Sequence, residues 1–332
     1  MSGRIYVEGE PKLLTVQDSG RRGAMRFGVS ASGPMDWVRF AHALALCGGT
    51  SAAFEVGVAG ATFRATGEIA LAVTGPGFSV RKGDREAIEA PARIILDNGE
   101  RLSLMPGRTG MWAYVAIGGI DFGTPVLGSY ATNTRTGLGM RDFSNGFEVS
   151  EAGVPGETLA VLDVPLREGP IGLLPGPQHH LFDEAVRDTF AATPYSLTNA
   201  LDRMGYRLEG APLKAITHDI ISDGIVEGAI QVPGNGQPIV LCADRAPTGG
   251  YPKIAVVASA DLPRLTQSRP GTALRFQWID LTEAERRRSA IRRALSNPAE
   301  PRVRSEFSSQ FLAERNLIGG VVAADLGDHS SG

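Results

Sequence analysis

The sequence lacks the features that would place the protein in a membrane, on nucleic acid or outside the cell. Only two of its 332 residues are cysteines, Cys47 and Cys242, and each lies in an apolar segment, as buried free thiols do. The longest apolar runs, such as IVLCA and AVVASA, are far shorter than the roughly 20 residues of a membrane-spanning helix. Charged residues follow the N-terminus at once, and the net charge is −3. We therefore expect a cytoplasmic protein that binds neither membrane nor nucleic acid.

Several common chemical motifs are also absent. There is no G-x-x-x-x-G-K-[ST] loop for a nucleoside triphosphate and no G-x-G-x-x-G unit for a dinucleotide. The stretch GVSASG is not a nucleophile elbow, because Ser32 stands where that motif requires glycine. His179 and His180 are adjacent and the other three histidines stand apart, so we expect no metal site. No Met-Lys-Met segment for covalent biotin occurs, so we expect no covalently bound cofactor.

What the sequence does contain is 42 glycines and 21 prolines, spread along the whole chain. Short apolar segments end repeatedly in glycine or a turn residue, which is typical of a mainly β protein built as a barrel or sandwich. Strands are predicted in KLLTVQDSG, GATFRA, EIALAVTG, ARIILDNG, ERLSLMPG, MWAYVAIGG, IGLLPGPQ, MGYRLEG, PIVLCA, KIAVVASA and GTALRFQW. The expected fold class is therefore mainly β (α+β), with few short helices.

The length favours two lobes, which we place at residues 1–165 and 166–295, followed by a loosely attached tail at 296–332. Residues 35–47 and LTEAERRRSAIRRALS show helical spacing of apolar residues, and HHLFDEAVRDTFAA presents one apolar helical face. Residues 128–156 lack periodicity and are predicted to form a long loop at the lobe boundary.

The segment ADRAPTGGYPKIA, residues 243–255, is the strongest candidate site. It joins two predicted strands as if in a hairpin, yet it carries far more chemistry than a hairpin connection needs. Arg245 offers a planar fork for a carboxylate, Asp244 can orient it or accept a proton, and Thr248 adds a hydroxyl. The pair Gly249-Gly250 lets backbone approach a ligand closely and can hold an oxyanion on its N–H groups. We predict Asp244, Arg245 and Thr248 as catalytic, and Gly249, Gly250, Tyr251 and the upstream Gln231 as substrate-binding.

Two further clusters admit either a functional or a structural interpretation. Asp36 follows the loop GVSASGP, where it can serve a site or act as the N-terminal carboxylate of the following helix. Asp202 and Arg203 precede the strand MGYRLEG, where they can bind substrate or form an ordinary turn. We add all three residues to the predicted substrate-binding set.

Several long motifs resemble the allophanate hydrolase subunit 2 family, also described as the biotin-dependent carboxyltransferase A/B family. They are TVQDSGRRG…GVSASGPMDW, FEVGVAGATF, and YSLTNALDRMGYRLEG continuing through ADRAPTGGYPKIAVVASA to RPGTALRF. The resemblance runs in order from about residue 12 to residue 280. Members of this family include the C-type subunit of 5-oxoprolinase and the regulator KipA.

The resemblance implies a mainly β carboxyltransferase-type unit that includes a cyclophilin-like barrel. It implies a KipI-like protein, the B-type subunit, as partner, together with a LamB/YcsF-like A-type subunit in 5-oxoprolinases. It also implies ATP use by the whole complex, and biotin, where present, on a separate protein. The substrate would be a small amide: 5-oxoproline, opened to glutamate, or urea, carboxylated from biotin. A KipA-like regulator without turnover stays open as an alternative.

The sequence departs from the family pattern at two places. Relatives commonly read DRQTTGGYP where this chain has Ala246 and Pro247, which removes a side-chain amide and a backbone N–H. In the region after residue 127, Tyr130 stands where relatives have arginine. These changes leave the identity of the substrate open.

Overall fold

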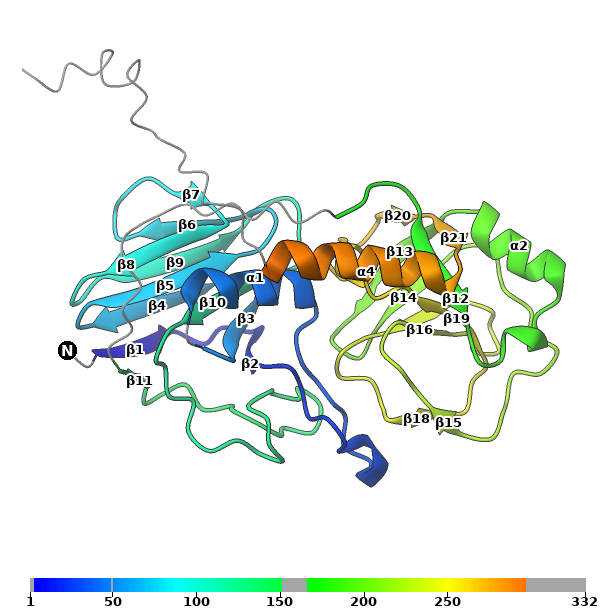
Figure 1. Ribbon diagram of the computed structural model, residues 1–332, viewed down its shortest axis with the longest axis horizontal. Coiled ribbons are helices and arrows are strands. Elements are labelled where there is room, and N and C mark those ends of the chain that lie inside the picture. Colours follow the sequence, from blue (N-terminus) through cyan, green and yellow to red (C-terminus); the bar gives the residue numbers. More distant parts are fainter. Residues whose placement is uncertain (1–2, 49, 151–165, 297–332) are drawn as a thin grey trace, which may run out of the picture.

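The computed structural model describes residues 3–48, 50–150 and 166–296 (Figure 1). Strands make up 34% of it and helices 17%, with four α-helices among the described residues. The prediction of a mainly β protein with few helices is therefore confirmed. In the described ranges, no helix has the length and apolar character needed to cross a membrane.

The first lobe is a sandwich of two antiparallel sheets. One sheet has the order β11-β1-β4-β9-β6-β7 and the other β2-β3-β10-β5-β8. The first consists of β1 (Gly3–Glu8), β4 (Ala61–Thr66), β6 (Phe78–Lys82), β7 (Ile88–Glu89), β9 (Arg101–Pro106) and β11 (Phe147–Val149). The second consists of β2 (Leu14–Gln17), β3 (Ala53–Gly57), β5 (Ile69–Thr74), β8 (Ala92–Leu96) and β10 (Trp112–Ile117). Their inner faces bury one apolar core that includes Ile5, Phe54, Phe63, Leu102 and Val115.

Strand β10 explains why the first lobe packs on the second. All six of its residues are buried, and they divide between two cores. Val115 faces the sandwich core, whereas Trp112 and Tyr114 face α1 (Trp37–Cys47) and the second lobe. Phe40 of α1 packs edge-on against Tyr114, with ring centroids 5.8 Å apart. An unbroken apolar run such as WAYVAI is expected where a strand is buried on both faces.

The second lobe is one eight-stranded sheet in the order β20-β13-β14-β17-β16-β19-β12-β21. Its strands are β12 (Ile171–Pro175), β13 (Tyr195–Leu201), β14 (Gly205–Glu209), β16 (Ala229–Gln231), β17 (Ile239–Leu241), β19 (Lys253–Val257), β20 (Ala273–Leu274) and β21 (Phe276–Trp278). The two edge strands, β20 and β21, are separated only by Arg275, so one short segment holds both edges together. The sheet is therefore curled into a nearly closed barrel, as expected.

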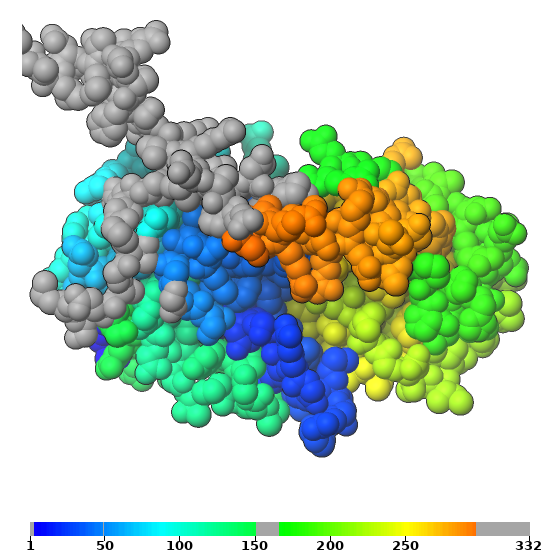
Figure 2. Space-filling model, viewed as in Figure 1, coloured from blue at the N-terminus to red at the C-terminus, as the bar shows by residue number. Residues whose placement is uncertain are grey.

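Helix α4 (Leu281–Ser296) crosses from the barrel to the sandwich and ties the lobes together (Figures 1 and 2). Ile291 of α4 packs with Val38 of α1 and Ala260, which precedes α3 (Leu262–Thr266). The remaining helices are α2 (Glu184–Ala192) and the single turns η1 (Met25–Phe27) and η2 (His179–Leu181).

One sequence-based expectation needs correction, and two others fall on residues outside the described ranges. The predicted loop 128–156 contains a short strand, β11, which pairs with β1 at the sheet edge. A three-residue edge strand is too short to show a period in the sequence. The predicted tail at 296–332 lies outside the described residues except for Ser296, and the stretch before the predicted boundary at 165/166 is also outside them.

Candidate functional site

The segment 243–255 is a crossover and not a hairpin. Strands β17 and β19, which flank it, are not neighbours, because β16 lies between them in the sheet. The segment therefore leaves the end of β17, passes over the barrel surface and returns on the far side of β16. On the way it forms β18 (Thr248–Gly249), which pairs with β15 (Asp223–Gly224) as a small ribbon. The hairpin expectation was wrong because local sequence does not reveal which strand is inserted between two others.

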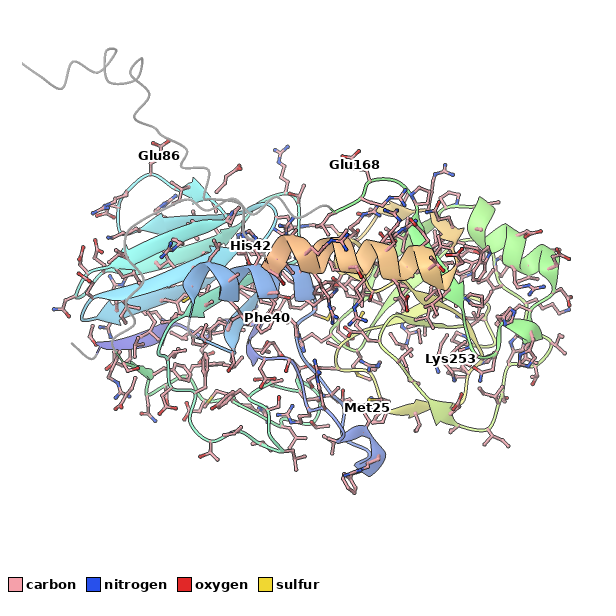
Figure 3. The ribbon with its side chains drawn as sticks, in the orientation of Figure 1. Met25, Phe40, His42, Glu86, Glu168 and Lys253 are labelled. Atoms are coloured by element: carbon pink, nitrogen blue, oxygen red, sulfur yellow. The ribbon has the colours of Figure 1, made fainter. Side chains whose placement is uncertain are left out.

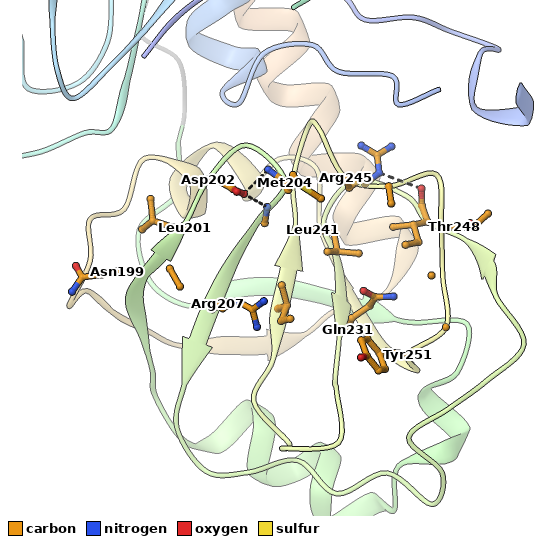
Figure 4. A pocket seen from close by; sticks show the side chains of 17 residues that line it. Asn199, Leu201, Asp202, Met204, Arg207, Gln231, Leu241, Arg245, Thr248 and Tyr251 are labelled. Atoms are coloured by element: carbon orange, nitrogen blue, oxygen red, sulfur yellow. Dashed lines mark hydrogen bonds between the residues drawn. The ribbon is translucent and has the colours of Figure 1, made fainter. Parts of the chain in front are cut away.

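Beneath this crossover lies a pocket of about 510 Å³ (Figure 4). Its lining residues come from β13, β14, β16 and β17 on one side and from the crossover and Ile225 on the other. They are Asn199, Ala200, Leu201, Asp202, Met204, Gly205, Arg207, Ile225, Gln231, Ile239, Leu241, Arg245, Ala246, Thr248, Gly249, Gly250 and Tyr251. Seven of the ten predicted site residues therefore meet at one pocket: Asp202, Gln231, Arg245, Thr248, Gly249, Gly250 and Tyr251.

Arg245 supplies a buried cation at this pocket. Its side chain donates from Nε to the Ile225 carbonyl oxygen at 3.2 Å and from Nη1 to the Cys242 carbonyl oxygen at 3.3 Å. The nearest partner of Nη2 is the Met25 sulfur at 3.9 Å. No carboxylate of the described residues lies within 4 Å of Arg245 in an ion pair. Burial lowers the pKa of Arg245 and the charges of Glu227 and Asp244 raise it, but an arginine stays charged at any physiological pH, so Arg245 is a fixed positive charge at the pocket.

Gln231 lies against the glycine pair of the crossover. Its side chain is only 7% exposed, and its Nε2 has no hydrogen-bond partner among the described residues. A Cβ on Gly249 would lie 2.6 Å from that nitrogen, so a larger residue there would displace the Gln231 amide from its position under the crossover. The amide of Gln231 is thus held under the crossover with a donor to spare.

The other lining residues have more ordinary surroundings. Asp202 accepts hydrogen bonds from the backbone N–H groups of Met204 and Gly205, at 2.8 and 3.1 Å, so it is a turn residue at the pocket edge. Tyr251 is 43% exposed. In Figure 4, Arg245 and Asp202 lie at the top of the pocket, with Gln231 and Tyr251 below them.

Asp244 and Arg203 do not line the pocket but form a buried ion-pair network between the lobes. Arg203 donates to both carboxylate oxygens of Asp244 at 3.1 Å, to the Gly33 carbonyl oxygen at 2.7 Å, and to Glu55 in a short contact. Asp244 also accepts from the backbone N–H and the hydroxyl of Thr134, at 3.0 and 2.9 Å. Asp244 therefore orients Arg203, and the expectation that it would orient Arg245 was wrong.

The electrostatics of this network keep Asp244 ionised. Burial by itself would raise the pKa of Asp244, but the attraction and hydrogen bonds of Arg203 lower it below its usual value. Burial would likewise lower the pKa of Arg203, but Glu55 and Asp244 together raise it. Complete burial raises the pKa of Glu55, and Arg203 offsets this only in part.

Asp36 is placed at the start of α1, away from the pocket. Its Oδ1 accepts from the backbone N–H groups of Val38 and Arg39, at 3.0 and 2.9 Å, as an N-cap residue does. Its Oδ2 accepts from Gln267 Nε2 at 2.9 Å. Of the two interpretations left open for Asp36, the geometry gives it the structural one.

The pocket and the network belong to a chain whose relatives are known. A family model described as the carboxyltransferase domain, subdomain A and B, matches residues 27–278. The chain belongs to this carboxyltransferase family. It is 36% identical to the C-type subunit of 5-oxoprolinase from Escherichia coli (strain K12) over 279 residues, which is 81% of this chain and 89% of that protein.

Solved structures agree with this assignment. The chain resembles the crystal structure of the K. lactis urea amidolyase with a TM-score of 0.80 and 25% identity, over 92% of this chain and 20% of that one. It resembles the crystal structure of TTHA0988 with a TM-score of 0.75 and 28% identity, over 83% of this chain and 56% of that one. This chain therefore spans about half of TTHA0988 and a fifth of the urea amidolyase.

Some residues of the ion-pair network and of the junction between the lobes were missed in the sequence. Glu55 lies in the buried strand AFEVG, where a lone acid among apolar residues was a usable signal for a buried ion pair. Gln267 accepts from the Met111 and Trp112 N–H groups, at 2.8 and 3.0 Å, and so joins the lobes. Neither Gln267 nor Thr134 stands in a pattern that marks it.

Proposed function

We propose that this chain is the C-type subunit of an ATP-dependent 5-oxoprolinase-type complex, which opens 5-oxoproline to glutamate. The observation that carries the proposal is the pocket under the crossover, where Arg245 and Gln231 face one space in a chain that aligns with most of a C-type 5-oxoprolinase subunit. The lactam 5-oxoproline offers its amide carbonyl oxygen and its carboxylate as acceptors. A fixed guanidinium and a spare amide donor are the groups that would bind and orient them.

In this proposal Arg245 anchors an anionic or carbonyl oxygen of the substrate. The backbone of the Gly249-Gly250 pair orients the planar amide, and the spare Gln231 donor binds a substrate oxygen. The Thr248 hydroxyl belongs to the same pocket and is available to pass a proton. Asp244 and Arg203 act from outside the pocket: they fix the start of the crossover and hence the position of Arg245.

The described pocket offers few groups for a triphosphate. Its lining includes only two cationic side chains, Arg207 and Arg245, and no helix N-terminus. We therefore assign ATP use to the partner proteins, which are the KipI-like B-type subunit and the LamB/YcsF-like A-type subunit. Biotin, if the complex uses it, would be carried by a separate protein.

The test is ATP-dependent release of glutamate from 5-oxoproline by the purified complex of this chain with its KipI-like and LamB/YcsF-like partners. We expect Arg245→Met to lower kcat/KM by about 100-fold, as loss of one well-placed charged donor does. Arg275→Met, which changes an exposed arginine between β20 and β21, is the matched control and should retain full activity. Unchanged turnover in a folded Arg245→Met complex would remove Arg245 from the mechanism.

A second candidate is carboxyl transfer to urea, favoured by the structural similarity to the K. lactis urea amidolyase. It predicts that the chain carboxylates urea when a carboxylated biotinyl protein is supplied, and that 5-oxoproline is not turned over. Tight binding of the KipI-like partner with neither activity would instead support the KipA-like regulator.

A further inference from the structure

Lys253 lies beside Gln231 on the pocket side of the barrel. The two residues are directly opposite each other on β16 and β19. Opposite residues on antiparallel strands point to the same face, with Cβ atoms about 4.5–5.5 Å apart. Lys253 does not itself line the pocket, but it points to the same face of the sheet as Gln231, which does, just after a register shift between Ile230 and Gln231. Figure 3 places Lys253 between β16 and the ribbon of β15 and β18.

Both side chains end in buried donors that are not satisfied. Lys253 is 1% exposed and Gln231 is 7% exposed, and neither Lys253 Nζ nor Gln231 Nε2 has a hydrogen-bond partner among the described residues. The nearest acid to Lys253 is Asp223, whose Oδ2 is 3.8 Å from Nζ. That oxygen already accepts from Gln178 Nε2 at 3.1 Å, and Asp223 is half exposed to water. Buried donors without acceptors cost free energy in the empty protein, and a ligand that brings acceptors recovers it.

The charged side chains that line the pocket are two arginines and one aspartate, and Glu227 lies close enough to Arg245 to raise its pKa. Arg245 has no carboxylate within 4 Å in the described chain, and the carboxylate of Asp202 is used by two turn N–H groups. Burial lowers the pKa of Lys253, and the partly exposed Asp223 offsets this only in part. The site therefore presents cations and N–H donors to its ligand and few free acceptors.

We propose that Gln231 and Lys253 form a carboxylate-binding subsite of this pocket, which makes it selective for small amides that also carry a carboxylate. The subsite lies under the Gly249-Gly250 turn, and Arg245 is left for the amide group. This inference rests on the proposed function. It adds the feature by which the pocket would distinguish its substrate from urea and other neutral amides, namely a carboxylate.

The test compares two lactams that differ only in the carboxylate, 5-oxoproline and 2-pyrrolidinone. Binding of each is measured by calorimetry to the assembled complex without ATP. We expect 5-oxoproline to bind about 10- to 100-fold more tightly than 2-pyrrolidinone, the effect of one charge-assisted contact. Lys253→Met should reduce the ratio of the two affinities at least about tenfold. It should change the Kd for 2-pyrrolidinone by less than about twofold. Gln231→Leu is a second, independent variant with the same expected direction.

Asp223→Asn is the matched control, because it removes the acid that faces Lys253 from outside. It should bind 5-oxoproline as tightly as the wild type or more tightly. Equal binding of the two lactams by the wild-type complex, or absence of 5-oxoproline binding, would overturn the subsite. A purely structural ion pair between Lys253 and Asp223 would give another result. Lys253→Met and Asp223→Asn would then lose the same stability, and lactam selectivity would not change. That result would also overturn the subsite.

The outcomes also separate this inference from the proposed function. If the complex releases glutamate and Lys253→Met leaves the KM for 5-oxoproline unchanged, the subsite is wrong and the proposed function stands. If 5-oxoproline binds with the expected dependence on Lys253 but no glutamate is released with ATP and all partners present, the subsite stands and the proposed reaction fails.

Discussion

Replacing Arg203 by methionine tests whether the buried network holds the two lobes together. The Arg203 side chain is 4% exposed, and the side chains of Glu55 and Asp244 are fully buried. Methionine keeps most of the volume but leaves these two carboxylates without a counter-ion, and the Gly33 carbonyl oxygen without its donor. Breaking a buried ion pair in this way costs about 3–5 kcal/mol, so we expect the free energy of unfolding to fall by that amount.

The sign of the pH dependence gives a second readout. In the wild type the pKa of Asp244 is lowered, so its contribution to stability is complete above the unfolded value of 3.8 and is lost as the pH falls through the folded pKa. Without Arg203, burial raises the pKa of Asp244 instead. The carboxylate then destabilises the variant at neutral pH, and protonation relieves this as the pH falls. The stability difference between the two proteins should therefore shrink from about pH 7 to about pH 5.

The assay is urea unfolding of the full chain at both pH values, followed by tryptophan fluorescence and circular dichroism. Arg207→Met, on the adjacent strand β14, is the control. Arg207 is exposed, and its replacement should change the free energy of unfolding by less than about 0.5 kcal/mol. A loss below about 1 kcal/mol in Arg203→Met, with no change between the two pH values, would refute the view that Arg203 neutralises ionised buried carboxylates.

Substitutions at three other positions probe the site and the junction. Gln267→Leu leaves two backbone N–H groups and Asp36 without their partner, and we expect it to lower the free energy of unfolding by about 2–4 kcal/mol in urea titrations. A change in the free energy of unfolding below about 0.5 kcal/mol would show that the junction between the lobes does not depend on the Gln267 side chain. Asp36→Ala should cost about 1–2 kcal/mol through loss of the N-cap, and Asp36→Asn clearly less, since it keeps a capping oxygen. Gly249→Ala would put Cβ 2.6 Å from Gln231 Nε2 and 2.8 Å from Ile225 Cδ1. It should raise the KM for 5-oxoproline about tenfold with the fold intact, and an unchanged KM would argue against Gln231 as a substrate contact.

Much of the site chemistry was recognisable in the sequence because it is local. Arg245 and the Gly249-Gly250 pair stand in one short segment whose composition does not suit a plain turn. Gln231 lies just upstream, at the end of β16. These residues meet at one pocket because the crossover folds back over the strand that precedes it. From sequence, Asp36 could be read as a helix N-cap and Asp202 as a turn residue. The hydrogen bonds observed for both match these structural roles.

The role of Asp244 was assigned to the wrong partner for a physical reason. In sequence its neighbour is Arg245, but successive residues point in different directions, and Asp244 turns towards Arg203. The partners that complete the network come from the other lobe: Thr134 is 110 residues from Asp244, and Glu55 is 148 residues from Arg203. No local pattern specifies pairings over such distances.

The sequence by itself determined the class of fold, the helices and most of the strands, and the family, because these depend on the spacing of apolar residues, on turn residues and on contiguous motifs. Only the tertiary structure decided that β16 is inserted between β17 and β19, that the edges of the barrel meet around Arg275, and that Lys253 stands beside Gln231. Strand order and register are set by which apolar faces are buried together across the whole chain, and that is a global property of the packing. The segment ADRAPTGGYPKIA thus contains several of the polar residues that line the pocket. The fold determines the path of this segment over β16 and the residues that it contacts.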